Sequence, residues 1–422
     1  MAARDDSFYR RVWRWHFIAG VLVGPLVFIV AVTGALYVFK RELEPLLHGS
    51  VLLVDPTGDR APLDRLVTAA EGGAPGDWRV EQVEIDSDPR RSVGVVLHGP
   101  DHEQRRLYVD PYRGEVLGEI SPLAFFPVVL RLHRDLFVGT GGRLMVELAT
   151  GWTIVLLATG LYLWWPRTSK RNRAVWLPTF TGPPYRVLRD WHAVAGFWAL
   201  PLAATIAITG LVYSYAWGTG FQLASYASGA YDDVLDPPER RSSNAAGSPT
   251  EWEAIYQAAA THAPDLAYTL LPPPSDRATA VVMAGAARGP SMTRLLAVDP
   301  RSGEVILDRR LAEFPALAQW ASWNYPLHTG SVLGLPTKIA WLVGSVVLAL
   351  MPVTGYWMWW RRRPPGKSGW PRRVDGPLPL GVKLAVFACS VALPVAGFSL
   401  SMVLCYDYAM RALSRRRETQ LR

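Results

Sequence analysis

The chain has 422 residues, of which 50% are hydrophobic and 18 are tryptophan, and its formal net charge is +8. This composition is too apolar for an ordinary soluble enzyme and too polar for a protein made only of membrane spans. The sequence therefore predicts membrane helices combined with sizeable segments outside the membrane.

Five apolar segments are long enough to cross a hydrocarbon core of about 30 Å. Tryptophans such as Trp13, Trp164 and Trp359 crowd their ends, as at membrane interfaces. Only the second segment carries a carboxylate, Glu147, which has no mate in the other half of the chain. The first is too long to be a cleaved signal peptide, so we expect it to remain as a span. The predicted spans are 17–39, 144–165, 191–217, 339–360 and 384–406.

Basic residues gather before the first span, between the second and third, and after the fourth. The positive-inside rule places these three groups in the cytoplasm and the long segments 40–143 and 218–338 outside. The fifth span would then leave Arg411 and Arg415–Arg417 outside as well, against the rule. The orientation of the C-terminus therefore stays open.

Each of the two outer segments has the same pattern of short elements. A predicted helix is followed by strands with alternating polarity, and then by a Val-Asp-Pro-x-x-Gly-Glu-Val turn at 109–116 and again at 298–305. We predict two copies of one small α+β module. The predicted helices are 62–71 and 251–262, and the strands are 78–85, 91–98, 105–110, 266–271 and 279–284.

The spans also repeat. Trp15-His16 with Gly20 recurs 176 residues later as Trp191-His192 with Gly196, and Leu132-His133 recurs 195 residues later as Leu327-His328. The sequence therefore predicts an internally duplicated bundle of four core spans plus a fifth. We divide the chain as 1–40 (first span), 41–130 (module 1), 131–166 (second span), 167–186 (inner loop), 187–217 (third span), 218–325 (module 2), 326–361 (fourth span), 362–380 (inner loop) and 381–422 (fifth span and basic tail).

The four repeated histidines are the candidate ligands, because imidazole in or beside hydrocarbon is costly and usually marks function. The topology places His16 and His192 near the inner side and His133 and His328 near the outer side. The other four histidines have no counterpart in the other half, and we expect them to be ordinary polar residues: His48, His98, His102 and His262.

A pair of histidines without nearby cysteine or glutamate fits zinc poorly, because zinc takes three or four such ligands. Two axial imidazoles from facing helices fit a b-type haem. Gly20 and Gly196, one turn after the inner histidines, would let a flat ring lie against the helix. Packing of small residues between helices is the alternative reading. Four Thr-Gly pairs, level with the histidines, supply the further candidates Gly34, Gly210, Gly160 and Gly355.

Basic residues near the histidines could neutralise haem propionates, although snorkelling to the interface would explain them too. Arg10, Arg14, Arg186 and Arg189 are the inner candidates. The outer candidates are Arg131, Arg134, Arg143 and Lys338. The two cysteines, Cys389 and Cys405, form no Cys-x-x-Cys-His motif for covalent haem attachment.

The ordered set of Trp-His-x-x-x-Gly spans, Leu-His pairs and Val-Asp-Pro-x-x-Gly-Glu-Val turns covers residues 8–362 and resembles the PepSY-associated transmembrane family. Within that family it is similar to inner-membrane ferric-siderophore reductases. The resemblance implies two b-type haems, periplasmic PepSY-like modules and delivery of electrons to Fe(III)-siderophores. The fifth helix and the basic tail depart from the minimal four-span pattern.

The function expected from this resemblance is a haem b reductase of the bacterial inner membrane, with the N-terminus in the cytoplasm. No Gly-x-Gly-x-x-Gly follows a strand, so we expect quinol or another protein as the electron donor, and no nucleic-acid partner. Two alternatives remain open. The chain could carry electrons to another periplasmic acceptor, or it could be a non-enzymatic sensor or assembly protein.

Overall fold

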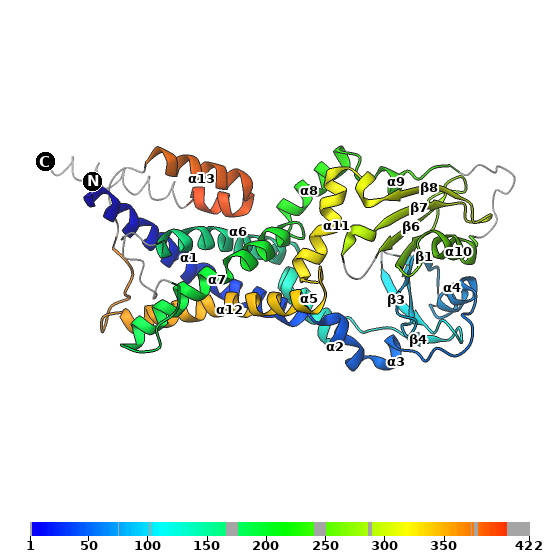
Figure 1. Ribbon diagram of the computed structural model, residues 1–422, viewed down its shortest axis with the longest axis horizontal. Coiled ribbons are helices and arrows are strands. Elements are labelled where there is room, and N and C mark those ends of the chain that lie inside the picture. Colours follow the sequence, from blue (N-terminus) through cyan, green and yellow to red (C-terminus); the bar gives the residue numbers. More distant parts are fainter. Residues whose placement is uncertain are drawn as a thin grey trace. The chain divides into compact units, whose positions relative to one another are not determined.

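The computed structural model describes residues 2–74, 76–100, 103–165, 176–239, 250–285, 289–372, 374 and 379–402. The chain forms two compact units, and each unit combines segments that are far apart in the sequence (Figure 1). The helical unit consists of residues 1–38, 129–221 and 339–422. The sheet unit consists of residues 39–128 and 222–338.

In the described part of the chain, four helices are long and apolar enough to cross a membrane, which confirms four of the predicted spans. On the last of them, exposed side chains recur at helical spacing along one face: Ile339, Val343, Val346, Leu350 and Val353. An apolar stripe of this length fits contact with lipid and not with water. The four helices are α1 (Ala2–Tyr37), α6 (Gly139–Trp164), α7 (Pro184–Leu211) and α12 (Leu335–Arg362).

Small residues bring these helices close together. A Cβ atom on Gly24 of α1 would lie 3.0 Å from Cβ of Pro352 in α12, and one on Gly344 of α12 would lie 3.1 Å from Cβ of Leu202 in α7. Helix α6 packs against both α1 and α7. The four helices therefore form one bundle with a shared interior.

The expected third span runs to residue 217. Helix α7 ends at Leu211, and a new helix, α8 (Ala216–Ala227), begins before residue 217 is reached. The buried carboxylate of Glu147 accepts hydrogen bonds from the backbone N–H groups of Ala216 at 2.7 Å and Trp217 at 3.1 Å. A carboxylate at this point satisfies unpaired N–H groups of the first turn and opposes the helix dipole. Glu147 thus fixes the change of direction between α7 and α8.

The predicted fifth span is not one continuous helix in the part of it that the structure describes. Helix α13 (Leu380–Ala392) stops at Leu393, before Pro394, and helical residues resume up to 402. Proline disfavours helical conformation in the preceding residue. A Cβ on Gly397 would lie 2.2 Å from Cα of Ser390, although seven residues of straight helix span about 10 Å. The segment therefore folds back on itself (Figure 1), and residues 403–406 lie outside the described range.

The strands form a single antiparallel sheet in the order β4-β3-β2-β1-β5-β6-β7-β8. Strand β1 pairs with β5, with Val83 opposite Leu270. The two predicted strand sets are thus joined, and the pairing removes one open edge from each. The strands are β1 (Arg79–Ile85), β2 (Val93–His98), β3 (Gln104–Val109), β4 (Val116–Gly118), β5 (Ala267–Leu271), β6 (Ala280–Gly285), β7 (Arg294–Val298) and β8 (Val305–Arg310).

Both predicted turns are present. In the first, Asp110 N–H donates to the carbonyl of Glu115 at 2.9 Å, and the Asp110 carboxylate accepts from Tyr112 N–H at 2.8 Å. Gly114 has φ of 72°, a left-handed conformation that glycine adopts without strain. The second turn repeats the backbone bond between Asp299 and Glu304 at 2.9 Å.

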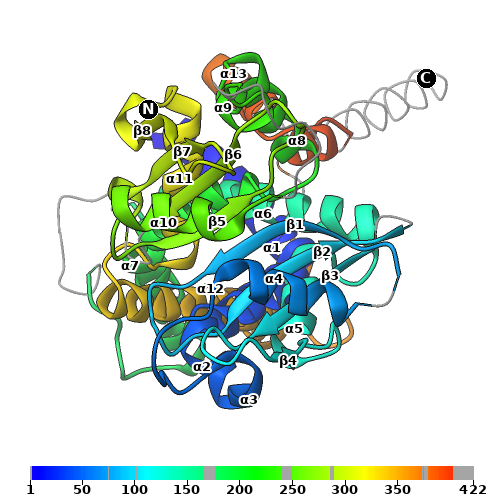
Figure 2. The same cartoon turned by 90° about the vertical axis from the view of Figure 1, so that its right-hand side faces the viewer.

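Helices α4 (Leu63–Gly72) and α10 (Trp252–His262) cover one face of the sheet (Figure 2). A carboxylate from each helix caps the N-terminus of the other helix. The Asp64 carboxylate accepts from the N–H groups of Trp252 at 2.7 Å and Glu253 at 3.1 Å, and the Glu253 carboxylate accepts from Leu63 N–H at 2.7 Å. Beneath them lies a buried core that includes Leu66, Val83, Val95, Ile255, Leu270 and Leu296.

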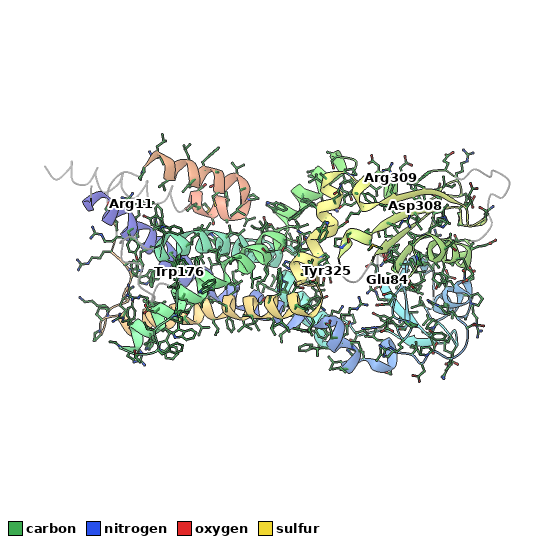
Figure 3. All side chains as sticks on the ribbon, in the orientation of Figure 1. Arg11, Glu84, Trp176, Asp308, Arg309 and Tyr325 are labelled. Atoms are coloured by element: carbon green, nitrogen blue, oxygen red, sulfur yellow. The ribbon has the colours of Figure 1, made fainter. Side chains whose placement is uncertain are left out.

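Shorter elements connect the main ones. At the β8 edge, Asp308 accepts from Arg294 at 2.9 Å and Arg309 donates to Asp233 at 2.6 Å (Figure 3). These ion pairs place charge on an edge strand, which discourages pairing with other chains. The connecting elements are α2 (Lys40–Leu47), α3 (Gly49–Leu52), α5 (Phe125–Asp135), α9 (Asp232–Leu235), α11 (Ala316–Thr329), η3 (Pro290–Met292) and η4 (Leu311–Glu313).

Candidate functional site

A cavity of about 540 Å³ lies inside the helical unit, between α1, α6, α7 and α12. Both His16 and His192 line it. Most of its wall is apolar, with leucines such as Leu156, Leu200 and Leu348. A pocket of this size and lining is typical of sites for small molecules and cofactors.

The rings of His16 and His192 come from facing helices, α1 and α7. Their centroids are 6.5 Å apart and their planes are at 89°. Each ring centre lies about 1 Å behind its ligating nitrogen, and metal–imidazole bonds are about 2 Å long, so imidazoles on opposite sides of one metal ion have centroids about 6 Å apart. The spacing of this pair therefore fits two axial ligands of one iron.

A threonine hydroxyl holds each of these rings. The Nδ1 atom of His16 lies 2.9 Å from Oγ1 of Thr159 in α6, and Nδ1 of His192 lies 2.7 Å from Oγ1 of Thr354 in α12. These contacts orient both rings by the same atom. The second nitrogen, Nε2, is the one left for a ligand in the cavity.

His133, on α5, is held in the same way. Its Nδ1 lies 3.0 Å from Oγ1 of Thr33 and 3.0 Å from the backbone carbonyl oxygen of Val30, both on α1. A carbonyl can only accept, so the proton of this imidazole is on Nδ1. Burial lowers the pKa of His133, which favours the neutral ring that a metal ligand requires.

His328 lies on α11 in the sheet unit, whereas His133 belongs to the helical unit. The pairing of these two histidines stays a prediction. The Thr209 hydroxyl, which corresponds to Thr33 in the repeat, donates to the carbonyl of Thr205 at 2.6 Å. The structure therefore brings His16 and His192 together, and it places His133 in contact with α1.

The glycines of the Thr-Gly pairs make room for the histidine rings themselves. A Cβ on Gly160 would lie 3.3 Å from Cε1 of His16, and one on Gly34 would lie 3.2 Å from Cε1 of His133. At Gly355 the corresponding distance to Cε1 of His192 is 4.0 Å. Gly160 and Gly355 also line the cavity, as the expected cofactor face requires.

Gly20 and Gly196 line the cavity, as the expected cofactor face requires. A Cβ on Gly20 would meet nothing within 4 Å, and one on Gly196 would meet only Sδ of Met351 at 3.4 Å. Gly20 therefore borders open space, and Gly196 makes ordinary contact. The assignment of Gly210 stays a prediction.

The sequence family supports this membrane architecture. The family described as the PepSY-associated TM region matches residues 13–362, which include all four long helices apart from the start of α1. The chain belongs to the PepSY-associated transmembrane family. No curated protein matches the chain. The predicted resemblance is confirmed at the level of the family, and the protein is a membrane protein.

Two cations predicted for this PepSY-associated protein's outer site already have partners. Lys338 donates to the Glu42 carboxylate at 2.6 Å. Arg143 donates to the carbonyl of Ser214 at 3.2 Å, and its guanidinium lies over the Tyr215 ring. Their role toward the acidic groups of a cofactor stays a prediction. The contacts with Glu42 and with the carbonyl of Ser214 would compete with that role.

At one end of the cavity two arginines line the wall. Arg189 was expected there, and it pairs with Asp190 at 2.8 Å. Arg362 was missed by the sequence analysis. It lies seven residues after Gly355, on the same helical face, and its guanidinium packs 4.5 Å from the Trp13 ring centre. The spacing from Gly355 could have identified it.

Aromatic side chains close another part of the same cavity. Trp164 and Phe197 both line it and stack with 3.8 Å between ring centroids. Trp176 packs edge-on against both (Figure 3). These stacked rings add apolar surface to the wall of the cavity.

The unrepeated histidines that the structure describes are not among the residues lining this cavity. The Nδ1 atom of His262 donates to the carbonyl of Ala258 at 2.9 Å, within its own helix. His48 joins α2 to α3, His98 ends β2, and His102 lies outside the described residues. Within the described ranges, no three His, Cys, Asp or Glu side chains gather to hold a metal ion, so a protein-only zinc site is not found there.

Proposed function

We propose that this PepSY-associated protein is a haem b reductase of the bacterial inner membrane, which passes electrons to Fe(III)-siderophores in the periplasm and so releases iron. The observation that carries the proposal is the pair His16 and His192, with ring centroids 6.5 Å apart in a cavity of about 540 Å³. A b-type haem bound there supplies reversible one-electron transfer.

The residues around the pair have distinct tasks in this proposal. His16 and His192 would hold the iron through Nε2, and the threonines behind them fix the rings. Gly20 and Gly196 leave room for a porphyrin face. Arg189 and Arg362 at the end of the cavity can neutralise propionates.

We further propose a second haem between His133 and His328, near the outer side. A quinol or a reduced protein donates electrons at the inner site. One quinol gives two electrons and two protons as it becomes quinone, which is enough to reduce two Fe(III) ions to Fe(II). Reduction releases the metal because Fe(II) matches the hard oxygen ligands of a siderophore less well than Fe(III) does.

The same proposal includes the arrangement in the membrane. The N-terminus lies in the cytoplasm and the sheet unit in the periplasm, in accordance with the basic clusters. Internal duplication of a span–module–span unit, with two PepSY-like modules joined through β1 and β5, accounts for the repeated motifs.

The test begins with haem content. Purified protein is expected to give about two b haems per chain in a pyridine haemochrome assay. His16→Ala and His192→Ala should each remove the same inner haem, whereas His48→Ala, away from the cavity, should leave the spectrum unchanged. Colourless protein, or His16 and His192 variants with different haem losses, would contradict the proposal.

Reductase activity needs a separate measurement. Protein reduced with dithionite and freed of excess reductant is mixed with a ferric trihydroxamate and an Fe(II) chelator. We expect reoxidation of the haem spectrum together with an equal amount of chelated Fe(II). A haem protein that stays reduced under these conditions would direct attention to another acceptor.

A further inference from the structure

We infer that the threonines of the Thr-Gly pairs are positioning residues, which fix the proton of each histidine ligand on Nδ1 and strengthen Nε2 as a donor to iron. This inference rests on the proposed function, because it assumes that the histidines bind haem. It concerns Thr159, Thr354 and Thr33, which act on the iron only through a histidine.

Each threonine hydroxyl contacts both a backbone carbonyl and a histidine ring. The hydroxyl of Thr159 donates to the carbonyl of Val155 at 2.7 Å, and that of Thr354 donates to the carbonyl of Leu350 at 2.9 Å. A hydroxyl has a single hydrogen, so the oxygen that faces the histidine is an acceptor. We assign the proton to Nδ1 of His16 and His192, because this arrangement satisfies both contacts of each hydroxyl.

The consequence is a fixed tautomer. With Nδ1 protonated, Nε2 keeps its lone pair, as iron ligation requires. A hydrogen bond from the distal N–H also makes an imidazole ligand more basic. The threonine thus acts on the two properties of the ligand that matter, the position of its proton and the strength of its nitrogen donor.

The arrangement recurs on three different helix pairs. A threonine of α6 contacts the histidine of α1, a threonine of α12 contacts that of α7, and a threonine of α1 contacts that of α5. In each case the hydroxyl also donates to a carbonyl of its own helix, at 2.7 Å from Thr33 to Ile29. Packing by small residues explains the adjacent glycines, but it does not require a hydroxyl at each preceding position. Recurrence beside three histidines favours a role toward the ring.

The test compares three variants on α6. Thr159→Val keeps the shape of the side chain and removes the hydroxyl, and Thr159→Ser keeps the hydroxyl. Thr150→Val is the matched control, because the Thr150 hydroxyl donates to the carbonyl of Val146 at 2.8 Å in the same way, and Thr150 is not among the residues that line the cavity. Thr354→Val repeats the test at the other ligand of the same iron.

Two readouts are taken on purified protein, namely the midpoint potential of each haem by spectroelectrochemical titration and the rate of haem transfer to apomyoglobin. Thr159→Val should raise the potential of the inner haem, because a weaker donor stabilises Fe(III) less. Its haem should leave about 10-fold faster or more, as for other losses of a ligand's hydrogen-bond partner. Thr159→Ser and Thr150→Val should match the wild type.

The outcomes separate the two proposals. A wild-type protein without haem overturns the proposed function and this inference together. Haem-loaded Thr159→Val and Thr354→Val with wild-type potential and retention overturn the inference alone. Equal shifts in Thr159→Val and Thr150→Val also overturn it, because a general effect of hydroxyl loss on α6 would then suffice. If Thr159→Val does not insert, Thr354→Val decides.

Discussion

A glycine is most needed where a histidine ring from a neighbouring helix lies against it. Gly160 and Gly355 occupy corresponding places in the repeat, but the room beside them differs. An added methyl group would lie 3.3 Å from Cε1 of His16 at the first position and 4.0 Å from Cε1 of His192 at the second. The first distance forces the ring to shift, and the second is ordinary van der Waals contact.

This difference gives a graded prediction. Gly160→Ala should displace His16 and lower the occupancy of the inner haem, whereas Gly355→Ala should retain it. Both changes favour helix formation by about 1 kcal/mol, so loss of α6 or α12 does not explain the expected result. Optical spectra and haem-to-protein ratios of the two purified variants decide. Equal occupancy in both would mean that the ring has more freedom than its contacts indicate.

At the scale of elements, α4 and α10 are tied together by carboxylates from each other's first turn. Asp64→Ala removes the acceptor of two backbone N–H groups at the start of α10. Loss of such a cap costs about 1–2 kcal/mol in the free energy of unfolding. We expect a lower midpoint of thermal unfolding for the sheet unit, measured by circular dichroism in detergent.

The exposed Asp59, in the loop before α4, supplies the control for this prediction. Asp59→Ala should unfold like the wild type. Glu253→Ala, which removes the acceptor for Leu63 N–H, should resemble Asp64→Ala to a smaller degree, because one bond is lost in place of two. Stability unchanged in Asp64→Ala would show that water replaces the carboxylate without cost.

What the sequence could predict at this scale depended on periodicity and repetition. Long apolar runs identified four helices of spanning length, and the Val-Asp-Pro-x-x-Gly-Glu-Val motif identified two turns. The pairing of β1 with β5 could not be read from either segment, because it joins strands about 185 residues apart. Glu147 was set aside because it lacks a mate, although its carboxylate starts α8. Unrepeated residues that make one tertiary contact leave no such pattern.

At the scale of the whole molecule, the C-terminal segment changes the predicted topology. The bend of this segment at Leu393 lies beside Gly151 of α6. A Cβ atom added to Gly151 would be 2.7 Å from Cβ of Ala396. The neighbouring Trp152 donates to the Ser399 hydroxyl at 2.9 Å. Gly151 is midway along α6 (Gly139–Trp164). The 13 residues of α13 span about 20 Å, less than the hydrocarbon core of about 30 Å. We therefore predict that residues 380–402 enter the membrane to mid-depth and turn back.

A re-entrant segment returns the chain to the side from which it came. We therefore expect Arg411 and Arg415–Arg417 of the sequence, which lie outside the described residues, on the same side as Arg361–Arg363. This expected placement agrees with the positive-inside rule, which a fifth crossing would break. Exposed apolar side chains on both arms, Leu384, Phe387, Val391 and Phe398, fit contact with lipid.

Labelling of single cysteines tests this topology without reference to haem. In a background with Cys389→Ser and Cys405→Ser, cysteine is placed at Ser368 before the segment, at Thr419 after it, or at Thr57 in the sheet unit. Three spanning helices separate Thr57 from Ser368. With a membrane-impermeant maleimide on intact spheroplasts, we expect labelling at position 57 alone, and at 368 and 419 only after permeabilisation. A cysteine at 419 that reacts like the one at 57 would mean that the segment crosses the membrane after all, and the tail would then stand as an exception to the charge rule.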